Sequence, residues 1–231
     1  MSREISAEGD GATRIDARPG AATEPSAARG LLPLHCGARG GVCYVPAAVD
    51  AKKAAPLLVM LHGAGGSGER SIGLLQPYAD REGVILVAPD SVSATWDLVQ
   101  QRPGPDVERL DDALAMLFAR YTVDASRLAI AGFSDGASYA LSLGLDNGDL
   151  FTHVIAYSPG FMSVSEPVGA PRVYVSHGTG DEVLPIHVCS RRLVPQLQRA
   201  GYDVTYREFD GGHTVPRANA TESTEWFLRA R

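Results

Sequence analysis

The sequence is poor in cysteine and has no excess of positive charge. Its 231 residues include 3 Cys, and 21 Lys and Arg stand against 27 Asp and Glu, giving a formal net charge of −6. An odd cysteine count without a C-x-x-C pair argues against a zinc knuckle or a redox motif. The negative charge argues against a nucleic-acid or anionic-membrane surface. We therefore expect no metal, no nucleic-acid partner and reduced thiols, although a disulfide between Cys36 and Cys43 is left open.

Long hydrophobic runs are also missing. No stretch reaches the roughly 18 apolar residues that suggest a membrane-spanning helix. The acidic N-terminus (Glu4, Glu8 and Asp10) lacks the apolar segment of a secretory signal, so we expect a cytoplasmic protein. Residues 1–29 contain almost no large apolar side chains and are expected to form a disordered tail. Residues 30–231 are enough for a single domain; the oligomeric state is left open.

Predicted strands and helices alternate along this domain. After a hairpin at 31–46, strands are expected at 57–61, 85–88, 128–133, 153–157, 173–176 and 204–209, and helices at 67–82, 107–121, 137–145, 187–200 and 216–229. Such alternation predicts an α/β fold with a mostly parallel central sheet and helices on both faces. The insertion at 151–172 is too short for a large cap domain, so the cleft is expected to be open.

The pentapeptide Gly132-Phe133-Ser134-Asp135-Gly136 lies between a predicted strand and a predicted helix. It matches G-x-S-x-G, the nucleophile elbow, in which a tight turn raises a serine hydroxyl above the sheet. The N-terminus of the following helix supplies backbone N–H groups that favour a developing oxyanion. Although the pattern also occurs in ordinary turns, this context predicts that Ser134 is a nucleophile.

A serine nucleophile needs a general base, and the base needs a carboxylate that orients it. Downstream, Asp181 follows a predicted strand in a loop, and His213 follows the next strand in a glycine-rich loop. This order of serine, acid and histidine is typical of the elbow-type hydrolases. We expect Asp181 to orient His213, whereas Asp210, three residues before the histidine, is interpreted as a turn residue.

A glycine-rich loop, His62-Gly63-Ala64-Gly65-Gly66, follows the first buried strand. Such a loop brings backbone amides close to a substrate, and an oxyanion hole needs one N–H besides that of Asp135. The N–H of Ala64 is the first candidate and that of Gly65 the second. His62 and His177 are expected to shape their loops.

Together these segments resemble the motifs of α/β-hydrolases. The segments are His62-Gly63-Ala64-Gly65-Gly66, Gly132-Phe133-Ser134-Asp135-Gly136, His177-Gly178-Thr179-Gly180-Asp181 and Gly211-Gly212-His213. The chain is most similar, over about residues 31–228, to the compact phospholipase/carboxylesterase branch, which is itself similar to acyl-protein thioesterases. The resemblance implies a triad of Ser134, Asp181 and His213 and an oxyanion hole from the amides of Ala64 and Asp135. It also implies hydrolysis of a small-molecule carboxylic ester through an acyl-enzyme, without a cofactor.

Other functions compete with this interpretation. Acyl-protein thioesterases usually carry glutamine after the serine, where this chain has Asp135, so an acyl-thioesterase or a lysophospholipase is kept only as an alternative. The segment 63–68 also matches G-x-G-x-x-G, with Asp90 after the next strand, as in an NAD-binding enzyme. That hypothesis gives no role to Ser134, Asp181 or His213. A non-catalytic binding module typically lacks a triad member, and none is missing here.

Loop residues are expected to line the open cleft around the serine. The substrate-binding candidates are Trp96, Phe161, Met162 and Leu184. Trp96 is the first choice because it lies in a long loop where core packing explains it least. An open cleft buries only the first few acyl carbons, so we expect a preference for short acyl chains.

Overall fold

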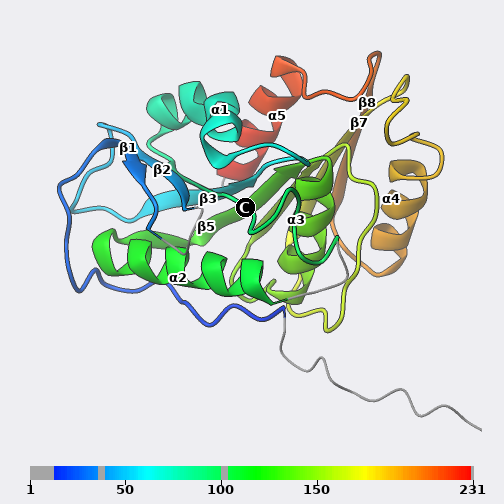
Figure 1. Cartoon of the computed structure of the whole chain (residues 1–231). Helices are drawn as coiled ribbons and strands as arrows, with labels where there is room; N and C mark the ends of the chain where they lie inside the picture. Colours follow the sequence, from blue (N-terminus) through cyan, green and yellow to red (C-terminus); the bar gives the residue numbers. More distant parts are fainter. Residues whose placement is uncertain (1–12, 36–39, 100–103, 230–231) are drawn as a thin grey trace, which may run out of the picture.

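The computed structural model describes residues 13–35, 40–99 and 104–229. Within these ranges, eight strands form one sheet in the order β1-β2-β4-β3-β5-β6-β7-β8 (Figure 1). The strands are β1 (Gly30–Pro33), β2 (Gly41–Val45), β3 (Ala55–Leu61), β4 (Ile85–Pro89), β5 (Val123–Phe133), β6 (His153–Tyr157), β7 (Arg172–Gly178) and β8 (Val204–Phe209). The hairpin strand β2 pairs antiparallel with β1 and β4, and all pairs from β4 to β8 are parallel. The predicted α/β fold is confirmed.

Five helices in the same ranges cover both faces of the sheet: α1 (Gly68–Glu82), α2 (Pro105–Arg120), α3 (Asp135–Asp146), α4 (Ser190–Arg199) and α5 (Arg217–Leu228). Figure 1 shows α1 and α5 on one face and α2 and α3 on the other. The fully buried strand β3 explains the two layers, because successive side chains of a strand point to opposite faces. Leu57 and Val59 pack into the core beneath α2 and α3, whereas Leu58 and Met60 pack beneath α1 and α5.

The ends of α1 show how local sequence sets the helix boundaries. Ser67 adopts an extended conformation before the helix, and its hydroxyl accepts a hydrogen bond from the N–H of Arg70 at 3.4 Å. At the other end Gly83 adopts the left-handed conformation, with φ of 69°, that glycine takes without steric cost. The predicted helix at 67–82 is therefore confirmed to within one residue.

The N-terminal segment 13–29 differs from the prediction. Ile15 is fully buried. Its N–H donates to Oδ1 of Asn147 at 2.9 Å, and Nδ2 of Asn147 donates to the carbonyl of Thr13 at 2.7 Å. Arg14 and Arg18 form ion pairs with Asp149. Disorder was predicted from composition, but one isoleucine and a few hydrogen bonds to residues beyond 140 are enough to order these residues. Residues 1–12 lie outside the described residues, and the domain boundaries stay a prediction.

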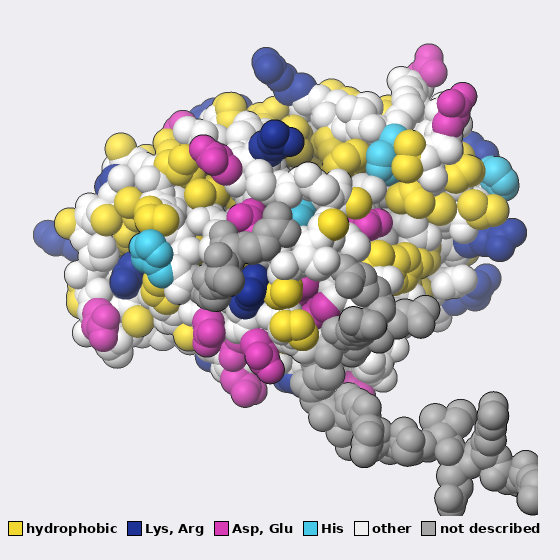
Figure 2. Space-filling model, viewed as in Figure 1, with side chains coloured by type: hydrophobic (Ala, Val, Ile, Leu, Met, Phe, Trp, Pro, Cys, Tyr) yellow, Lys and Arg dark blue, Asp and Glu magenta, His cyan; other side chains and the backbone are white. Residues whose placement is uncertain are grey.

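The described helices include none with the length and apolar character to cross a membrane. Four acidic residues lie along α2, and acidic side chains gather in Figure 2 at the lower left of the molecule, where α2 runs in Figure 1.

Cys43 and Cys189 are buried. The open question of a bridge between Cys36 and Cys43 is not decided, since Cys36 lies outside the described residues.

Replacing Ile15 by alanine should destabilise the protein. The side chain is fully buried, so its truncation removes apolar contacts and leaves a cavity, at a cost of about 2–5 kcal/mol in the free energy of unfolding. Urea denaturation measures this change. Leu31→Ala is the control, because Leu31 is 48% exposed and its truncation should cost about 0.5 kcal/mol or less. Equal midpoints for Ile15→Ala and the wild type would contradict the packing of this segment.

Candidate active site

Ser134 lies at the sharp turn that joins β5 to α3. Its φ of 58° and ψ of −121° place a non-glycine residue in a rarely occupied region. The N–H of Ser134 donates to the carbonyl of Tyr157 on β6 at 2.9 Å, which holds the strained turn in place. A Cβ at Gly132 would overlap the carbonyl of Gly136, and this close approach requires glycine. The sequence thus folds into the predicted elbow.

A continuous chain of hydrogen bonds links three of the predicted site residues. Nε2 of His213 lies 2.8 Å from Oγ of Ser134, and Nδ1 of His213 lies 2.6 Å from Oδ2 of Asp181. A carboxylate oxygen can only accept, so the neutral imidazole carries its proton on Nδ1 and its Nε2 accepts from the serine hydroxyl. The ring of Phe133 packs against the imidazole with 4.8 Å between ring centroids.

Asp181 is held as a buried carboxylate in its own loop. Its Oδ1 accepts the N–H groups of Val183 at 2.9 Å and Leu184 at 2.8 Å, which leaves Oδ2 for His213. Burial alone would raise the pKa of Asp181, but the N–H of Leu184 and the neighbouring His213 outweigh burial, so the pKa is lowered. Asp210, the rival carboxylate in sequence, is exposed.

His177 supports Asp181 from the other side. This fully buried imidazole lies 2.7 Å from Oγ of Ser190 through Nδ1. Its Nε2 lies 2.8 Å from the carbonyl of Leu184 and 3.1 Å from Oδ2 of Asp181. Burial lowers the pKa of His177, which keeps the ring neutral, with Nε2–H as the donor to the Leu184 carbonyl. Only its position four residues before Asp181 hinted at this contact in the sequence.

The glycine-rich loop after β3, whose Gly63 lies against Ser134, leaves the first-choice amide unused. The N–H of Gly65 donates to the carbonyl of Ala94 at 2.7 Å, so the second candidate for the oxyanion hole is already occupied. The N–H of Ala64 has no acceptor among the described residues. Asp135 is the first residue of α3, and no carbonyl within that helix can accept its N–H. Both first-choice amides therefore remain free to donate.

Trp96 does not line the cleft, and this prediction is wrong. Its side chain is only 1% exposed, its Nε1 donates to the carbonyl of His62 at 2.8 Å, and its ring stacks on Tyr139 with centroids 5.1 Å apart. The indole thus anchors the start of the glycine-rich loop from below. Core packing explains a tryptophan in this long loop because the loop itself folds back over α3.

His62 and Thr95 complete the support of this loop. Nε2 of His62 accepts the N–H of Ser91 at 3.0 Å, so its Nδ1 carries the proton and donates to the carbonyl of Gly63 at 2.7 Å. The hydroxyl of Thr95 donates to Oδ2 of Asp135 at 2.6 Å. Asp135 stands where acyl-protein thioesterases usually carry glutamine. Its carboxylate therefore ties the start of α3 to the segment after β4.

The other predicted cleft residues occupy the α3 side of the serine. Phe161 is 36% exposed, and the N–H groups of Gly160 and Phe161 donate to Oγ of Ser138 on α3. Leu184 lies directly over Gly160, because a Cβ there would be 3.2 Å from a Leu184 methyl group. Met162 is partly buried and packs on the core. Phe161 and Leu184 thus form an apolar rim, whereas Met162 contributes more to the core.

A pocket of about 330 Å³ lies on the opposite side of the serine, between α1 and the residues after His213. Its lining includes Met60, Gly63, Arg70, Leu74, Phe133 and Val215. No pattern in the sequence indicates this pocket, because its walls come from segments that are distant in sequence.

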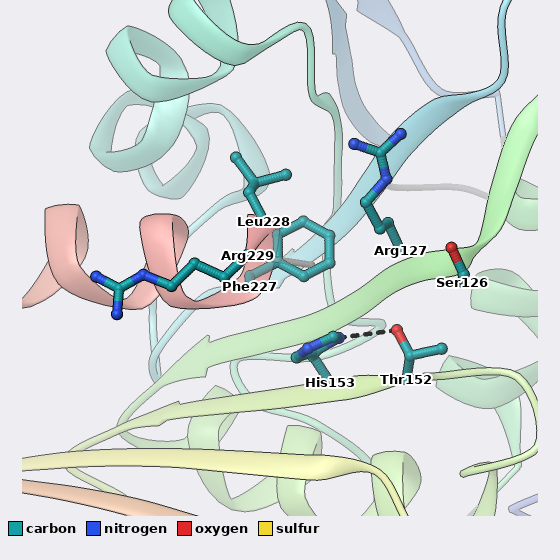
Figure 3. A pocket seen from close by; sticks show the side chains of 7 residues that line it. All are labelled: Ser126, Arg127, Thr152, His153, Phe227, Leu228 and Arg229. Carbon is teal, nitrogen blue, oxygen red and sulfur yellow. Dashed lines mark hydrogen bonds between the residues drawn. The ribbon is translucent and has the colours of Figure 1, made fainter. Parts of the chain in front are cut away.

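A separate cavity of about 420 Å³ lies at the other end of the strands (Figure 3). It is lined by the beginning of β6, where Thr152 Oγ1 lies 2.8 Å from His153 Nδ1, and by the last turn of α5. The side chains of Arg127 and Arg229 point away from each other in Figure 3. Because Ser134 follows the end of the neighbouring strand β5, this cavity is not part of the serine site.

The loop at 63–68 is arranged differently from a dinucleotide site. The carboxylate of Asp90, which would bind a ribose in an NAD-binding enzyme, accepts the N–H of Gly68 at 2.7 Å instead. Asp90 is therefore engaged at the start of α1.

The chain is similar to known esterases. Residues 110–184, which include Ser134 and Asp181, match the Esterase family, described as "Putative esterase". The chain is 31% identical over 153 residues to "Putative esterase NocK" of Nocardia uniformis subsp. tsuyamanensis, in an alignment covering 61% of this chain. The chain spans only 44% of the length of that protein.

Solved structures share the fold. The crystal structure of esterase PE8 superposes with a TM-score of 0.66 at 26% identity, covering 80% of this chain and 96% of that one. A phospholipase/carboxylesterase from Dyadobacter fermentans gives a TM-score of 0.64 at 21% identity, covering 91% of this chain and 100% of that one. The chain therefore has the α/β-hydrolase fold, and the resemblance to esterases of this fold is confirmed.

Replacing His177 by glutamine should weaken the pH dependence of stability on the acid side. Burial lowers the pKa of His177 in the folded protein, so below about 6.5 the unfolded chain binds a proton there that the folded protein does not. The free energy of unfolding should therefore fall as the pH drops below 6.5, by up to about 1.4 kcal/mol per pH unit from this group, until the lowered pKa is reached.

Urea denaturation between about pH 5 and pH 8 measures this slope. His177→Gln should flatten it, whereas the control His187→Gln, at an exposed histidine, should keep the wild-type slope. An unchanged slope in His177→Gln would show that His177 takes up its proton equally in both states.

Proposed function

We propose that this α/β-hydrolase-fold protein is a serine carboxylesterase in which Ser134 is the nucleophile, His213 the general base and Asp181 the orienting acid. The observation that carries the proposal is the hydrogen-bonded chain from Ser134 through His213 to Asp181 at a strained strand-to-helix turn. The unused amides of Ala64 and Asp135 lie on the two segments that meet at this turn. Sequence similarity to esterases supports the same reaction class.

The geometry gives each group a step in hydrolysis. The hydroxyl of Ser134 transfers its proton to Nε2 of His213 while Oγ attacks the acyl carbon of the ester. The resulting imidazolium is stabilised by Asp181, whose lowered pKa keeps the carboxylate charged. The oxyanion of the tetrahedral intermediate accepts hydrogen bonds from the amides of Ala64 and Asp135.

The second half of the cycle reverses these proton transfers. His213 returns its proton to the ester oxygen, the alcohol leaves, and an acyl-enzyme remains on Ser134. Water then gives a proton to His213 and attacks the acyl carbon, and the carboxylic acid leaves as Ser134 regains its proton. Atoms and charges balance with water as the only co-substrate.

The substrate is proposed to be a small-molecule ester with a short acyl chain. The apolar rim of Phe161 and Leu184 is partly exposed, so it can bury only the first acyl carbons. An acyl-thioesterase or a lysophospholipase would use the same chemistry and stays the alternative. A cytoplasmic location also stays a prediction.

Removing the nucleophile should abolish turnover without unfolding the protein. Ser134→Ala should lower kcat by several orders of magnitude, since the nucleophile and its base act as a unit, and should prevent labelling by a fluorophosphonate probe, read by intact mass. Asp181→Asn should lower kcat by up to about 10⁴ because it favours the wrong tautomer of His213. Asp210→Asn is the matched control and should cost far less, because Asp210 is exposed. The opposite ranking of the two asparagine variants would assign the orienting role to Asp210.

Trp96→Phe should lower kcat for every acyl chain length. The change keeps an aromatic ring against Tyr139 but removes the hydrogen bond to the carbonyl of His62, so the loop that carries Ala64 loses an anchor. Misplacement of a catalytic group by about 1 Å can cost up to 10²-fold in rate. The measurement is kcat for 4-nitrophenyl esters of rising chain length.

The matched control is Trp226→Phe. Trp226 is 6% exposed on α5, and its indole nitrogen has no hydrogen-bond partner in the described part of the chain, so its replacement should leave kcat unchanged. A Trp96→Phe enzyme with normal kcat and a flattened chain-length preference would restore Trp96 as a residue of the acyl site.

A further inference from the structure

The pocket between α1 and the residues after His213 lies one residue away from Ser134 and His213. Gly63 in its wall lies against the serine, since a Cβ there would be 3.3 Å from Cβ of Ser134. Phe133 in its wall packs its ring on the imidazole of His213. Thr214 and Val215, which directly follow the histidine, complete this side. Gly63 therefore separates the pocket from Ser134, and Phe133 separates it from His213, so a group bound there lies one residue away from each of them.

The pocket combines apolar walls with a single charged side chain. Met60, Leu74, Phe133 and Val215 supply the apolar surface, and Arg70 is the one ionised group among the residues that line it. Arg70 has no carboxylate partner within the described ranges, whereas Arg191 and Arg207 are paired with glutamates.

Glu69, which precedes Arg70 on α1, does not line the pocket, and two carboxylates on the segments after β4 and β5 bind other groups. Asp90 accepts the N–H of Gly68, and Asp135 accepts the hydroxyl of Thr95. The positive charge of Arg70 is therefore not neutralised within the pocket, although the protein as a whole carries a net charge of −6.

We propose that this pocket binds the alcohol part of the ester and that Arg70 selects substrates that carry a carboxylate or similar anion there. The assignment rests on the proposed esterase function. The leaving oxygen must receive its proton from Nε2 of His213, so the alcohol part lies on the side of His213, where Thr214 and Val215 line the pocket. A guanidinium is the side chain best suited to bind a carboxylate through two parallel hydrogen bonds.

The test compares two acetyl esters that differ in one charge. The probes are 4-acetoxybenzoate and its neutral amide, 4-acetoxybenzamide, and the measured quantity is the ratio of their kcat/KM values. The wild type should prefer the benzoate by about tenfold, the value of a hydrogen bond to a charged group. Arg70→Gln should bring the ratio close to one, and Arg70→Lys should retain part of the preference. Added salt should reduce the wild-type ratio because the arginine is exposed.

Arg199→Gln is the matched control. Arg199 is an exposed arginine at the end of α4, without an ion-pair partner among the described residues, and its loss changes the net charge of the protein by the same amount. This variant should keep the wild-type ratio. A ratio that falls equally in Arg199→Gln and Arg70→Gln would mean that overall charge sets the preference, which would overturn the proposal.

A second pair of probes places the charge on the acyl part: the mono-4-nitrophenyl ester of succinic acid and 4-nitrophenyl pentanoate. If Arg70→Gln changed the ratio of kcat/KM values for this second pair but not for the first, the assignment of the pocket to the alcohol part would be overturned. Hydrolysis of all four esters with no dependence on Arg70 would overturn the role of Arg70 and leave the esterase function intact. If no ester is hydrolysed and Ser134 is not labelled by the fluorophosphonate, both proposals fail.

Discussion

The site depends on how closely the turn at Ser134 packs against the end of β3. A Cβ at Gly136 would overlap the carbonyls of Leu61 and His62, so only glycine lets α3 start this near to the neighbouring strand. That approach brings Gly63, which precedes Ala64, against Ser134, which precedes Asp135. One steric constraint in the backbone thus sets the positions of the proposed nucleophile and of the segments that carry the proposed oxyanion donors.

A second layer of polar contacts keeps the glycine-rich loop in this position. Trp96 and His62 hold the loop through its carbonyl groups, and both are buried. The segment that carries Trp96 is itself fixed by Asp106, whose carboxylate accepts the N–H groups of Val92 and Asp97 at 2.7 and 2.8 Å. Burial raises the pKa of Asp106, while the two N–H groups lower it, and burial prevails. Buried groups with fixed partners thus support a loop that has little regular structure of its own.

Sequence patterns predicted those parts of the structure that depend on residues close together in the sequence. The elbow, the strand-end loops with Asp181 and His213, and the strands and helices all follow from short-range patterns of glycines and apolar residues. The burial of Ile15 could not be predicted, because its partner Asn147 lies far away in sequence and composition carries no such information. Trp96 was misplaced for a related reason. The stacking partner Tyr139 and the acceptor on His62 come from two other elements, so no local pattern separates a buried anchor from an exposed substrate contact.

The two sides of Ser134 differ in chemistry, and this difference suggests how an ester would lie. On the α3 side, Phe161 and Leu184 offer apolar surface, and Val183 beside them is 66% exposed. Each buried CH₂ group contributes about 0.8 kcal/mol, but a chain on an open rim keeps much of its surface in water and gains less. On the α1 side, the pocket has a volume of about 330 Å³ and carries the charge of Arg70. Acyl carbons beyond the first few therefore add little to binding, which fits the proposed preference for short chains, and the charged side offers the greater scope for discriminating between substrates.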